Sequence, residues 1–289
     1  MVGVESYVNC KLCPRGCGVD RTAGEVGFCG CGDLALVAKT MIHRWEEPAL
    51  APGGKSGAVF FGGCTLGCVY CQNRAISTAP KGVPMDGAAL RRELEALIDQ
   101  GAENIDLVTP GHFLPTVVEA LRPKLPVPVV YNCGGYERVE SLRALEGLVD
   151  VYLPDLKYAQ GPLGGELSGA ADYFEVATEA ILEMVRQTGP VQFRGEKLVR
   201  GVLIRHLILP GQVENSLKVL DWIGETFAPG QVLVSLMRQY TPMPGMRPPL
   251  DRGITAQEYD GVLSWMLLNR LDGFTQEAGT DKESFIPDF

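Results

Sequence analysis

The chain has 289 residues, of which 46% are hydrophobic, so it is long enough for one large domain with a small extension and needs no disulfides to hold it together. Its formal net charge of -9 argues against general nucleic-acid binding, because phosphate backbones are bound by basic patches. No signal-peptide pattern opens the sequence, and no later run is apolar enough to cross a bilayer. We therefore expect a soluble, cytoplasmic protein whose nine cysteines serve as metal ligands or catalytic groups.

The chain begins with a cysteine-rich segment of low apolar content. In "CKLCPRGCGVDRTAGEVGFCGCG" a C-x-x-C pair is followed by three more cysteines among glycines and basic residues. A metal would organise such a segment, as a closed thiolate site for zinc or iron or as an auxiliary iron–sulfur cluster. The spacing does not choose between these metals. We predict the ligands Cys10, Cys13, Cys17 and Cys29, with Cys31 as the spare or as a substitute for Cys29.

Apolar, β-rich runs alternate with helical patterns along the rest of the chain. Nearly continuous apolar runs are typical of parallel strands that are buried on both faces. We predict six such strands, at residues 57–63, 104–110, 127–132, 149–155, 201–209 and 232–240. Helical spacing predicts helices within residues 86–101, 114–123, 138–148, 172–189, 215–227 and 255–273.

This alternation predicts an α/β fold with a parallel sheet and right-handed crossovers. Six strand–helix units are fewer than the eight of a closed TIM barrel. We expect a partial, open (βα)6 barrel with a C-terminal tail at residues 57–289, after a cysteine-rich extension at residues 1–56. A flat doubly wound sheet is the alternative. In either form the loops at the carboxyl ends of the strands lie at one edge and form the site.

The first predicted strand leads into "FFGGCTLGCVYCQN", in which Cys64, Cys68 and Cys71 form a CxxxCxxC array. A [4Fe-4S] cluster has four irons, so three cysteines leave one iron open, as a catalytic metal site requires. The alternative is a zinc site completed by a distant histidine or cysteine. The position after the first strand, with the aromatic Tyr70 before the last cysteine, favours the cluster.

These features resemble the radical SAM superfamily, whose signature is CxxxCxΦC, with Φ aromatic, after the first strand of a partial (βα)6 barrel. The resemblance covers residues 57 to about 273. "CKLCPRGCGVD", "VYNCGGYE", "VDVYLPDLKY" and "SLMRQYTP" are further similar to the pyruvate formate-lyase activating enzyme-like iron–sulfur proteins. The resemblance implies that S-adenosylmethionine (SAM) binds the open iron. One electron then cleaves it to methionine and a 5′-deoxyadenosyl radical, which abstracts hydrogen.

The resemblance also implies which residues contact the cosubstrate, all of them in loops at the carboxyl edge. It places Tyr70 beside the adenine, and the turn with Thr109 and Gly111 at the methionine amino group. Polar or charged groups would contact the remaining polar atoms of SAM: Asn132, Asp155, Lys157 and Arg205. Ordinary packing is the alternative for the aromatic, and a surface ion pair for Asp155 with Lys157.

Two histidines and one cysteine outside these motifs are weaker candidates. We expect His112 and His206 to be hydrogen-bonded structural residues, which lone histidines usually are. Cys133, at the end of the third predicted strand, is either a thiol hydrogen donor or a small buried filler, and we favour the filler.

The function expected from the resemblance is that of an oxygen-sensitive radical SAM oxidoreductase. Its substrate is not specified; activation of a partner protein by a glycyl radical is one version. Flavodoxin or ferredoxin is the expected electron donor. The alternatives are a radical SAM enzyme that modifies a peptide or small molecule, and a non-catalytic iron–sulfur assembly or sensing factor.

Overall fold

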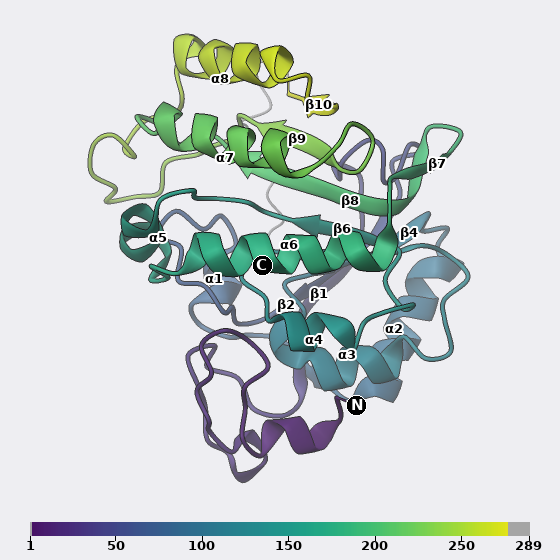
Figure 1. Ribbon diagram of the computed structural model, residues 1–289. Helices are drawn as coiled ribbons and strands as arrows, with labels where there is room; N and C mark the ends of the chain where they lie inside the picture. The colour runs from purple at the N-terminus through teal and green to yellow at the C-terminus, as the bar shows by residue number, and fades with distance from the viewer. Residues whose placement is uncertain (1, 277–289) are drawn as a thin grey trace.

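The computed structural model describes residues 2–276, so the predicted C-terminal tail lies mostly outside the described residues. A ten-stranded sheet forms its centre, in the order β10-β9-β8-β6-β5-β4-β2-β1-β3, with β7 paired to β8 (Figure 1). The described residues contain no helix that is long and apolar enough to cross a membrane.

All six predicted strands are confirmed, and each pairs in parallel with the next one in the sheet. They are β2 (Ser56–Phe61), β4 (Asn104–Val108), β5 (Val129–Cys133), β6 (Val151–Pro154), β8 (Lys197–Leu207) and β9 (Leu233–Met237). Four strands were not predicted: β1 (Ala35–His43), β3 (Val83–Met85), β7 (Gln192–Arg194) and β10 (Gly273–Thr275).

Helices formed wherever the spacing predicted them. They are α2 (Gly87–Asp99), α3 (Leu114–Ala120), α4 (Val139–Arg143), α6 (Tyr173–Thr188), α7 (Val213–Thr226) and α8 (Ala256–Leu268). The prediction missed α1 (Arg74–Ser77), α5 (Gly161–Ser168) and three short 3-10 helices, η1 (Val4–Tyr7), η2 (Arg21–Ala23) and η3 (Gly111–Phe113).

The sheet curls around the loop that joins β1 to β2. Side chains of β5, β6, β8 and β9 meet Leu50 of this loop in one buried cluster. Asn104 Nδ2 donates a hydrogen bond to Leu50 O at 2.7 Å, and Ser56 Oγ donates to Asn104 Oδ1 at 2.7 Å. Strands that are not neighbours in the sheet therefore share one buried cluster on its inner face.

The N-terminal segment packs at one end of the sheet, near α3 and α4 (Figure 1). Arg21 is 2% exposed and donates a hydrogen bond to His112 O at 2.6 Å. Its guanidinium lies 4.4 Å from the ring centroid of Tyr7. Ser141 Oγ donates to Leu12 O at 2.7 Å. These contacts join the segment to the sheet although it contains little regular structure.

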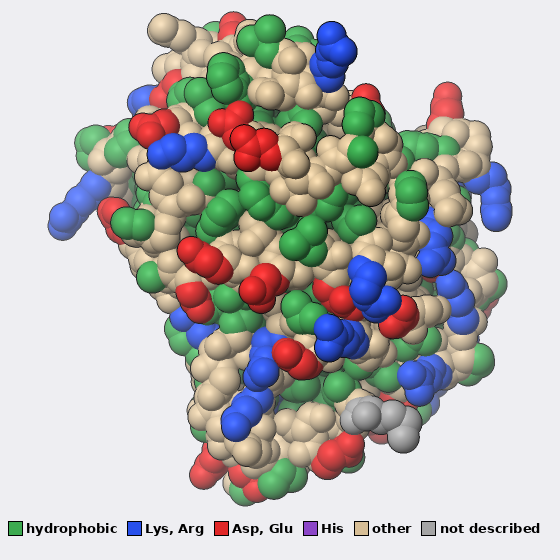
Figure 2. All heavy atoms as spheres, in the orientation of Figure 1, with side chains coloured by type: hydrophobic (Ala, Val, Ile, Leu, Met, Phe, Trp, Pro, Cys, Tyr) green, Lys and Arg blue, Asp and Glu red, His purple; other side chains and the backbone are tan. Residues whose placement is uncertain are grey.

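Charged side chains of both signs are interspersed over the described residues on the face shown in Figure 2. Such a surface has no broad field of one sign to attract a polyanion.

Tyr173, on α6, connects the ends of β5 and β6. Its hydroxyl lies 2.8 Å from Gly134 O and 2.7 Å from Asp155 O, both acceptors, and accepts a hydrogen bond from Lys157 N at 3.0 Å. The side chain is fully buried. One hydroxyl therefore holds two strand ends in position.

We predict that Tyr173→Phe lowers the free energy of unfolding by about 1 to 3 kcal/mol, because buried backbone groups lose their partner. Urea denaturation in anaerobic buffer measures the loss. Tyr136→Phe is the matched control, since that hydroxyl donates only to the Asp172 carboxylate at 2.8 Å. Equal losses in the two variants would contradict the prediction.

Candidate functional site

The loop at the carboxyl end of β2 carries the three cysteines of the CxxxCxxC array. It leaves the strand through Gly63, whose φ of 81° favours glycine. A Cβ at this position would lie 2.4 Å from Cys31 Sγ, so the N-terminal segment approaches closely here. Leu66 N donates a hydrogen bond to Cys64 Sγ at 3.3 Å. The loop thus turns tightly around its first thiol.

Neighbouring thiols of this loop affect the ionisation of Cys64. Burial and the charges of Cys68 and Cys71 raise the pKa of Cys64 to about 12, while Lys157 acts to lower it. No three His, Cys, Asp or Glu side chains converge on a single-ion position anywhere in residues 2–276. In a [4Fe-4S] cluster, by contrast, each thiolate binds a different iron, so the sulfurs need not converge on one point. A cationic cluster would replace the protons of these thiols.

A chain of hydroxyl groups links the cysteine loop to α5 and to the end of β6. Cys68 Sγ lies 2.9 Å from Ser168 Oγ, which lies 2.7 Å from Tyr158 OH. Tyr158 OH in turn lies 2.6 Å from Tyr70 OH. The Tyr70 ring is buried and faces that of Tyr240, with centroids 6.1 Å apart. The sequence analysis missed Tyr158 and Ser168, and contact between Tyr70 and adenine stays a prediction.

Four of the predicted cosubstrate residues lie in one polar network. Arg205 Nε lies 2.9 Å from Asp155 Oδ1, and the Lys157 ammonium pairs with the other carboxylate oxygen. Arg205 Nη2 donates to Asn132 Oδ1 at 2.6 Å. Burial opposes ionisation of Asp155, but the charges of Arg205 and Lys157 outweigh it and lower its pKa. The side chains of this triad are 16% to 20% exposed, so it is not a surface ion pair.

Acidic groups that the sequence analysis did not select lie next to this network. Asn132 Nδ2 donates to Asp106 Oδ2 at 3.3 Å, and Asp106 Oδ1 is buried with no hydrogen-bond partner among the described residues. Burial and the charge of Glu46 raise the pKa of Asp106. Glu47 accepts from Ser235 Oγ at 2.7 Å, and burial raises its pKa to about 7. An aspartate inside the apolar run "NIDLV" was the sequence signal for this group.

The turn after β4 lies beside Asn132. Thr109 has a φ of 61° and its N–H donates to Asn132 O at 2.8 Å. Gly111 lies against a buried carboxyl group, because a Cβ there would be 2.4 Å from Glu137 Oε2. Glu137 accepts a hydrogen bond from Tyr131 OH at 3.2 Å, and burial raises its pKa to about 8. The sequence analysis quoted the motif that contains Glu137 without selecting it.

The prediction that both histidines are hydrogen-bonded is confirmed. His206 Nδ1 lies 2.6 Å from Leu156 O, and Nε2 lies 2.9 Å from Ser216 Oγ. His112 Nε2 lies 2.8 Å from Gly62 O. Burial lowers the pKa of each imidazole to about 4, so both are neutral at physiological pH.

Cys133 ends β5 and is 2% exposed. Burial, followed by the nearby charge of Glu137, raises the pKa of its thiol well above the ordinary value. A buried, protonated thiol is in keeping with the favoured role of small filler.

The N-terminal cysteines divide into two groups. Cys31 Sγ donates to Cys29 O at 3.2 Å and lies 3.5 Å from Gly62 O, next to the CxxxCxxC loop. The other four thiols border one small pocket: Cys10, Cys13, Cys17 and Cys29. Cys29 therefore lines this pocket and Cys31 does not, while a hydrogen bond joins the thiols of Cys29 and Cys31.

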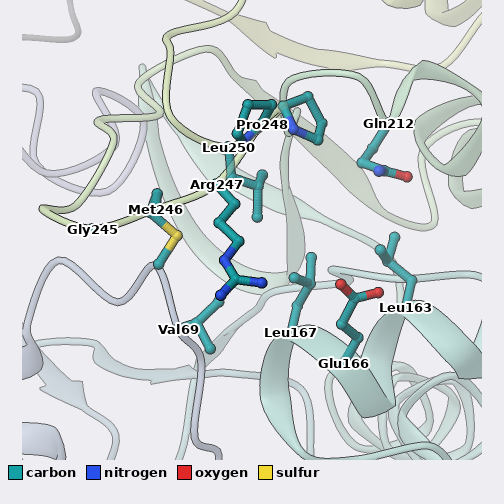
Figure 3. A pocket seen from close by; sticks show the side chains of 11 residues that line it. Val69, Leu163, Glu166, Leu167, Gln212, Gly245, Met246, Arg247, Pro248 and Leu250 are labelled. Atoms are coloured by element: carbon teal, nitrogen blue, oxygen red, sulfur yellow. The ribbon is translucent and has the colours of Figure 1, made fainter.

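A cleft of about 310 Å³ opens beside the CxxxCxxC loop, which contributes Val69 (Figure 3). One wall is α5 and the other is the loop after β9. Glu166, from α5, and Arg247, from that loop, project into the same space. The remaining walls are mostly apolar and include Leu163, Leu167, Met246, Pro248, Pro249 and Leu250.

Two curated archaeal proteins are similar in sequence to this chain. Uncharacterized protein MJ0674 of Methanocaldococcus jannaschii is 29% identical over 273 residues, which cover 89% of this chain and 74% of that protein. MJ0808 of the same organism is 26% identical over 232 residues, 73% of this chain and 63% of that protein. No family model matches the chain.

The fold is similar to that of solved radical SAM enzymes. SuiB of Streptococcus suis, bound to its precursor peptide SuiA, matches with a TM-score of 0.52 at 12% identity, over 75% of this chain and 47% of SuiB. A radical SAM methyltransferase from Sphaerobacter thermophilus matches with a TM-score of 0.51 at 12% identity, over 76% of this chain and 66% of that one. This chain thus spans about half the length of SuiB. At these identities the similarity concerns the fold alone.

We predict that Glu137 makes stability fall as the pH rises. Its folded pKa, about 8, lies above the ordinary value of 4.5, so the folded state binds more protons between these values and loses stability through this window. The stability of wild type relative to Glu137→Gln should fall by on the order of 3 kcal/mol between pH 5 and pH 8.

Denaturation at several pH values tests this prediction. Glu140→Gln, at an exposed glutamate of the same segment, is the control and should follow the wild type. Parallel stability curves for wild type and Glu137→Gln would show that Glu137 is already ionised in the folded protein.

Proposed function

We propose that this protein is a radical SAM enzyme of the pyruvate formate-lyase activating enzyme-like branch. The observation that carries the proposal is the CxxxCxxC loop at the carboxyl end of β2, in a fold similar to that of radical SAM enzymes. Three adjacent thiols open toward a polar network and a cleft. Each of these elements is required if a radical is to be made and used in one place.

The donor set fits a [4Fe-4S] cluster that is held by Cys64, Cys68 and Cys71. Three thiolates satisfy three irons, and the fourth stays open for the amino and carboxylate groups of SAM. When bound, the cluster would supply the electron that cleaves the sulfur–C5′ bond of SAM, giving methionine and a 5′-deoxyadenosyl radical. Lys157, whose charge acts on both Cys64 and Cys68, would hold the cosubstrate end of the site positive.

The polar network suits the carboxylate of SAM. Lys157 and Arg205 carry two positive charges; Asp155 pairs with both of them, and Glu46 and Glu47 also act on Arg205. The SAM carboxylate would be a further partner for these two cations in a low-dielectric site. Asn132 is fixed by Arg205 and would contribute a polar contact without charge.

The remaining predicted contacts surround the same space. Tyr70 would offer an apolar face to the adenine while its hydroxyl stays bonded to Tyr158. The turn at Thr109 and Gly111 would direct backbone carbonyls to the methionine amino group. The Thr109 N–H is already bonded to Asn132 O, which links this turn to the polar network.

The cleft in Figure 3 is the proposed substrate site. It adjoins the cysteine loop through Val69, and its apolar walls with one acid and one base suit a peptide segment better than a small polar metabolite. A protein substrate, activated by hydrogen abstraction from glycine, is one version. Modification of a peptide is the other, and the SuiB structure with its precursor peptide is an example of that class on this fold.

Flavodoxin or ferredoxin is the proposed one-electron donor, and a reducing, cytoplasmic compartment would keep all nine free thiols available. A non-catalytic iron–sulfur assembly or sensing factor is the second candidate. The observation that favours it is the pairing of Asp155 with Lys157 and Arg205, because each of these three charges already has a partner within the protein. Formation of 5′-deoxyadenosine by the reduced protein separates the two candidates.

We predict that replacing Cys64, Cys68 and Cys71 together with alanine abolishes 5′-deoxyadenosine formation and removes one cluster's iron and sulfide. The reason is that these thiols are the only proposed protein ligands of the catalytic cluster. Anaerobic reconstitution with iron and sulfide analysis measures it. Cys133→Ala is the control, because Cys133 ends β5 and is not part of the CxxxCxxC array, and should keep the full iron content. Unchanged iron and sulfide in the triple variant would refute the assignment.

Lys157→Ala should weaken SAM binding about ten- to a hundredfold while the cluster stays intact, since a charge-assisted contact contributes about 1.5 to 3 kcal/mol. Anaerobic calorimetry measures the dissociation constant, and a thermal melt of the same sample reports stability. Lys124→Ala, which breaks a surface pair with Asp150, is the control. A lower melting temperature with an unchanged dissociation constant would make Lys157 a structural residue.

A further inference from the structure

Four cysteine thiols border a second pocket, separate from the CxxxCxxC loop. We call it the four-cysteine pocket: Cys10, Cys13, Cys17 and Cys29. The backbone turns around these thiols, because Gly18 N donates to Cys10 O at 2.9 Å and Gly16 N to Cys13 O at 3.1 Å. Such tight turns at C-x-x-C pairs are what bring two sulfurs to face one ligand.

The pocket is shaped for an occupant. Phe28 N donates a hydrogen bond to Cys17 Sγ at 3.4 Å, so a backbone donor is already directed at one sulfur. A Cβ at Gly27 would lie 2.8 Å from the same sulfur, which leaves room only for glycine. Leu12 and Val19 supply apolar walls. Cys10 and Cys13 are buried, Cys29 is half-buried and Cys17 is exposed, so the pocket is closed on its inner side. Backbone N–H groups that bond to sulfur are typical of thiolate-bound metal centres.

The pocket shares its inner wall with the CxxxCxxC loop. Arg15, between two of the pocket cysteines, donates from Nε to Thr65 O at 2.9 Å and from Nη2 to Ser168 O at 3.2 Å. His112 lines the pocket and bonds to Gly62 O at 2.8 Å. Cys31 fills the space between the two cysteine sets. The sets are therefore adjacent and joined by hydrogen bonds.

Charge decides what kind of ligand the pocket requires. Four thiolates would carry four negative charges, and Arg21 is the only cationic side chain in the lining. A metal must supply the remaining positive charge, and thiolate donors select zinc or iron–sulfur centres. Zinc requires all sulfurs about 2.3 Å from one ion, whereas no three His, Cys, Asp or Glu side chains within residues 2–276 converge on a single-ion position. A cluster, in which each thiolate binds its own iron, does not need such convergence.

We propose that Cys10, Cys13, Cys17 and Cys29 bind a second iron–sulfur cluster, which holds the N-terminal segment against the CxxxCxxC loop. Binding of this cluster does not depend on the proposed catalytic function. It explains why a segment with little regular structure keeps a defined form, because metal-binding free energy is also folding free energy. Cys31 is outside the ligand set.

Metal content of three full-length variants, reconstituted anaerobically with iron, sulfide and equimolar zinc, tests the proposal. The variant without Cys64, Cys68 and Cys71 should keep one cluster's iron and sulfide and lose the other. A variant with alanine at all four pocket cysteines should lose the complementary cluster. Cys31→Ala is the matched control, from the same segment but outside the pocket, and should keep the iron of both.

Spectra and protease protection provide the second measurement, which remains informative if the four-cysteine variant folds poorly. In the variant without Cys64, Cys68 and Cys71, reduction should give the electron paramagnetic resonance signal of one cluster. Wild type should show that signal broadened by interaction with its neighbour. Loading that variant with iron and sulfide should also protect residues 10–31 from proteolysis.

The possible outcomes separate this proposal from the proposed function. Zinc in place of iron in the variant without Cys64, Cys68 and Cys71, or no metal at all, overturns the second cluster. Loss of iron from Cys31→Ala overturns the ligand set. If the variant without Cys64, Cys68 and Cys71 keeps all the wild-type iron, the proposed catalytic cluster fails instead, whatever the four-cysteine pocket binds.

Discussion

The pairing of Asp155 with two cations is the constraint that organises the carboxyl edge of the sheet. Three charged groups at low exposure are tolerated only if each has a partner, since an unpaired buried charge is very costly. The pairing also fixes the backbone: Asp155 and Arg205 form an isolated parallel bridge, and Leu156 N donates to Arg205 O at 2.9 Å. Beyond the regular pairing of β6 with β8, this bridge holds the two strand ends at a set separation. The proposed cosubstrate site is built on that separation.

The N-terminal segment and α5 complete the site from outside the sheet. Arg15 reaches backbone carbonyls in both the CxxxCxxC loop and α5, while Ser168 bonds to the thiol of Cys68. The proposed catalytic loop therefore lies between two elements that are far apart in sequence. The geometry of this loop therefore depends on contacts with the N-terminal segment and with α5, in addition to its attachment to the sheet.

The six parallel strands could be predicted because burial on both faces leaves a continuous apolar run, as in "NIDLV" of β4. α5 could not, because "GPLGGELS" contains three glycines and a proline and has poor intrinsic helix propensity. Tertiary contacts of Ser168 and the left-handed cap at Gly169 stabilise it instead. β1 pairs antiparallel with β2 and β3, and in its sequence "ALVAKTMIH" Lys39 and Thr40 interrupt the apolar run, so it lacks the continuous apolar pattern of the parallel strands.

The same reasoning separates the site residues. Cys64, Cys68 and Cys71 lie within eight residues of one another, so their spacing alone predicted a shared ligand. Glu137 becomes notable only through burial, which the sequence does not report, whereas the apolar run "NIDLV" around Asp106 was a signal that the sequence analysis did not use.

Contacts between distant segments set the order in which this protein can mature. Arg15 bonds to Ser168 O, 153 positions later in the chain. At ordinary rates of synthesis the ribosome needs roughly 10 to 30 s to make the intervening residues. During that time the first cysteines have left the ribosome, but α5, which later packs against their segment, has not yet been made. Delivery of the proposed metal to these thiols would therefore follow synthesis of α5, or a carrier would protect the nascent chain until then.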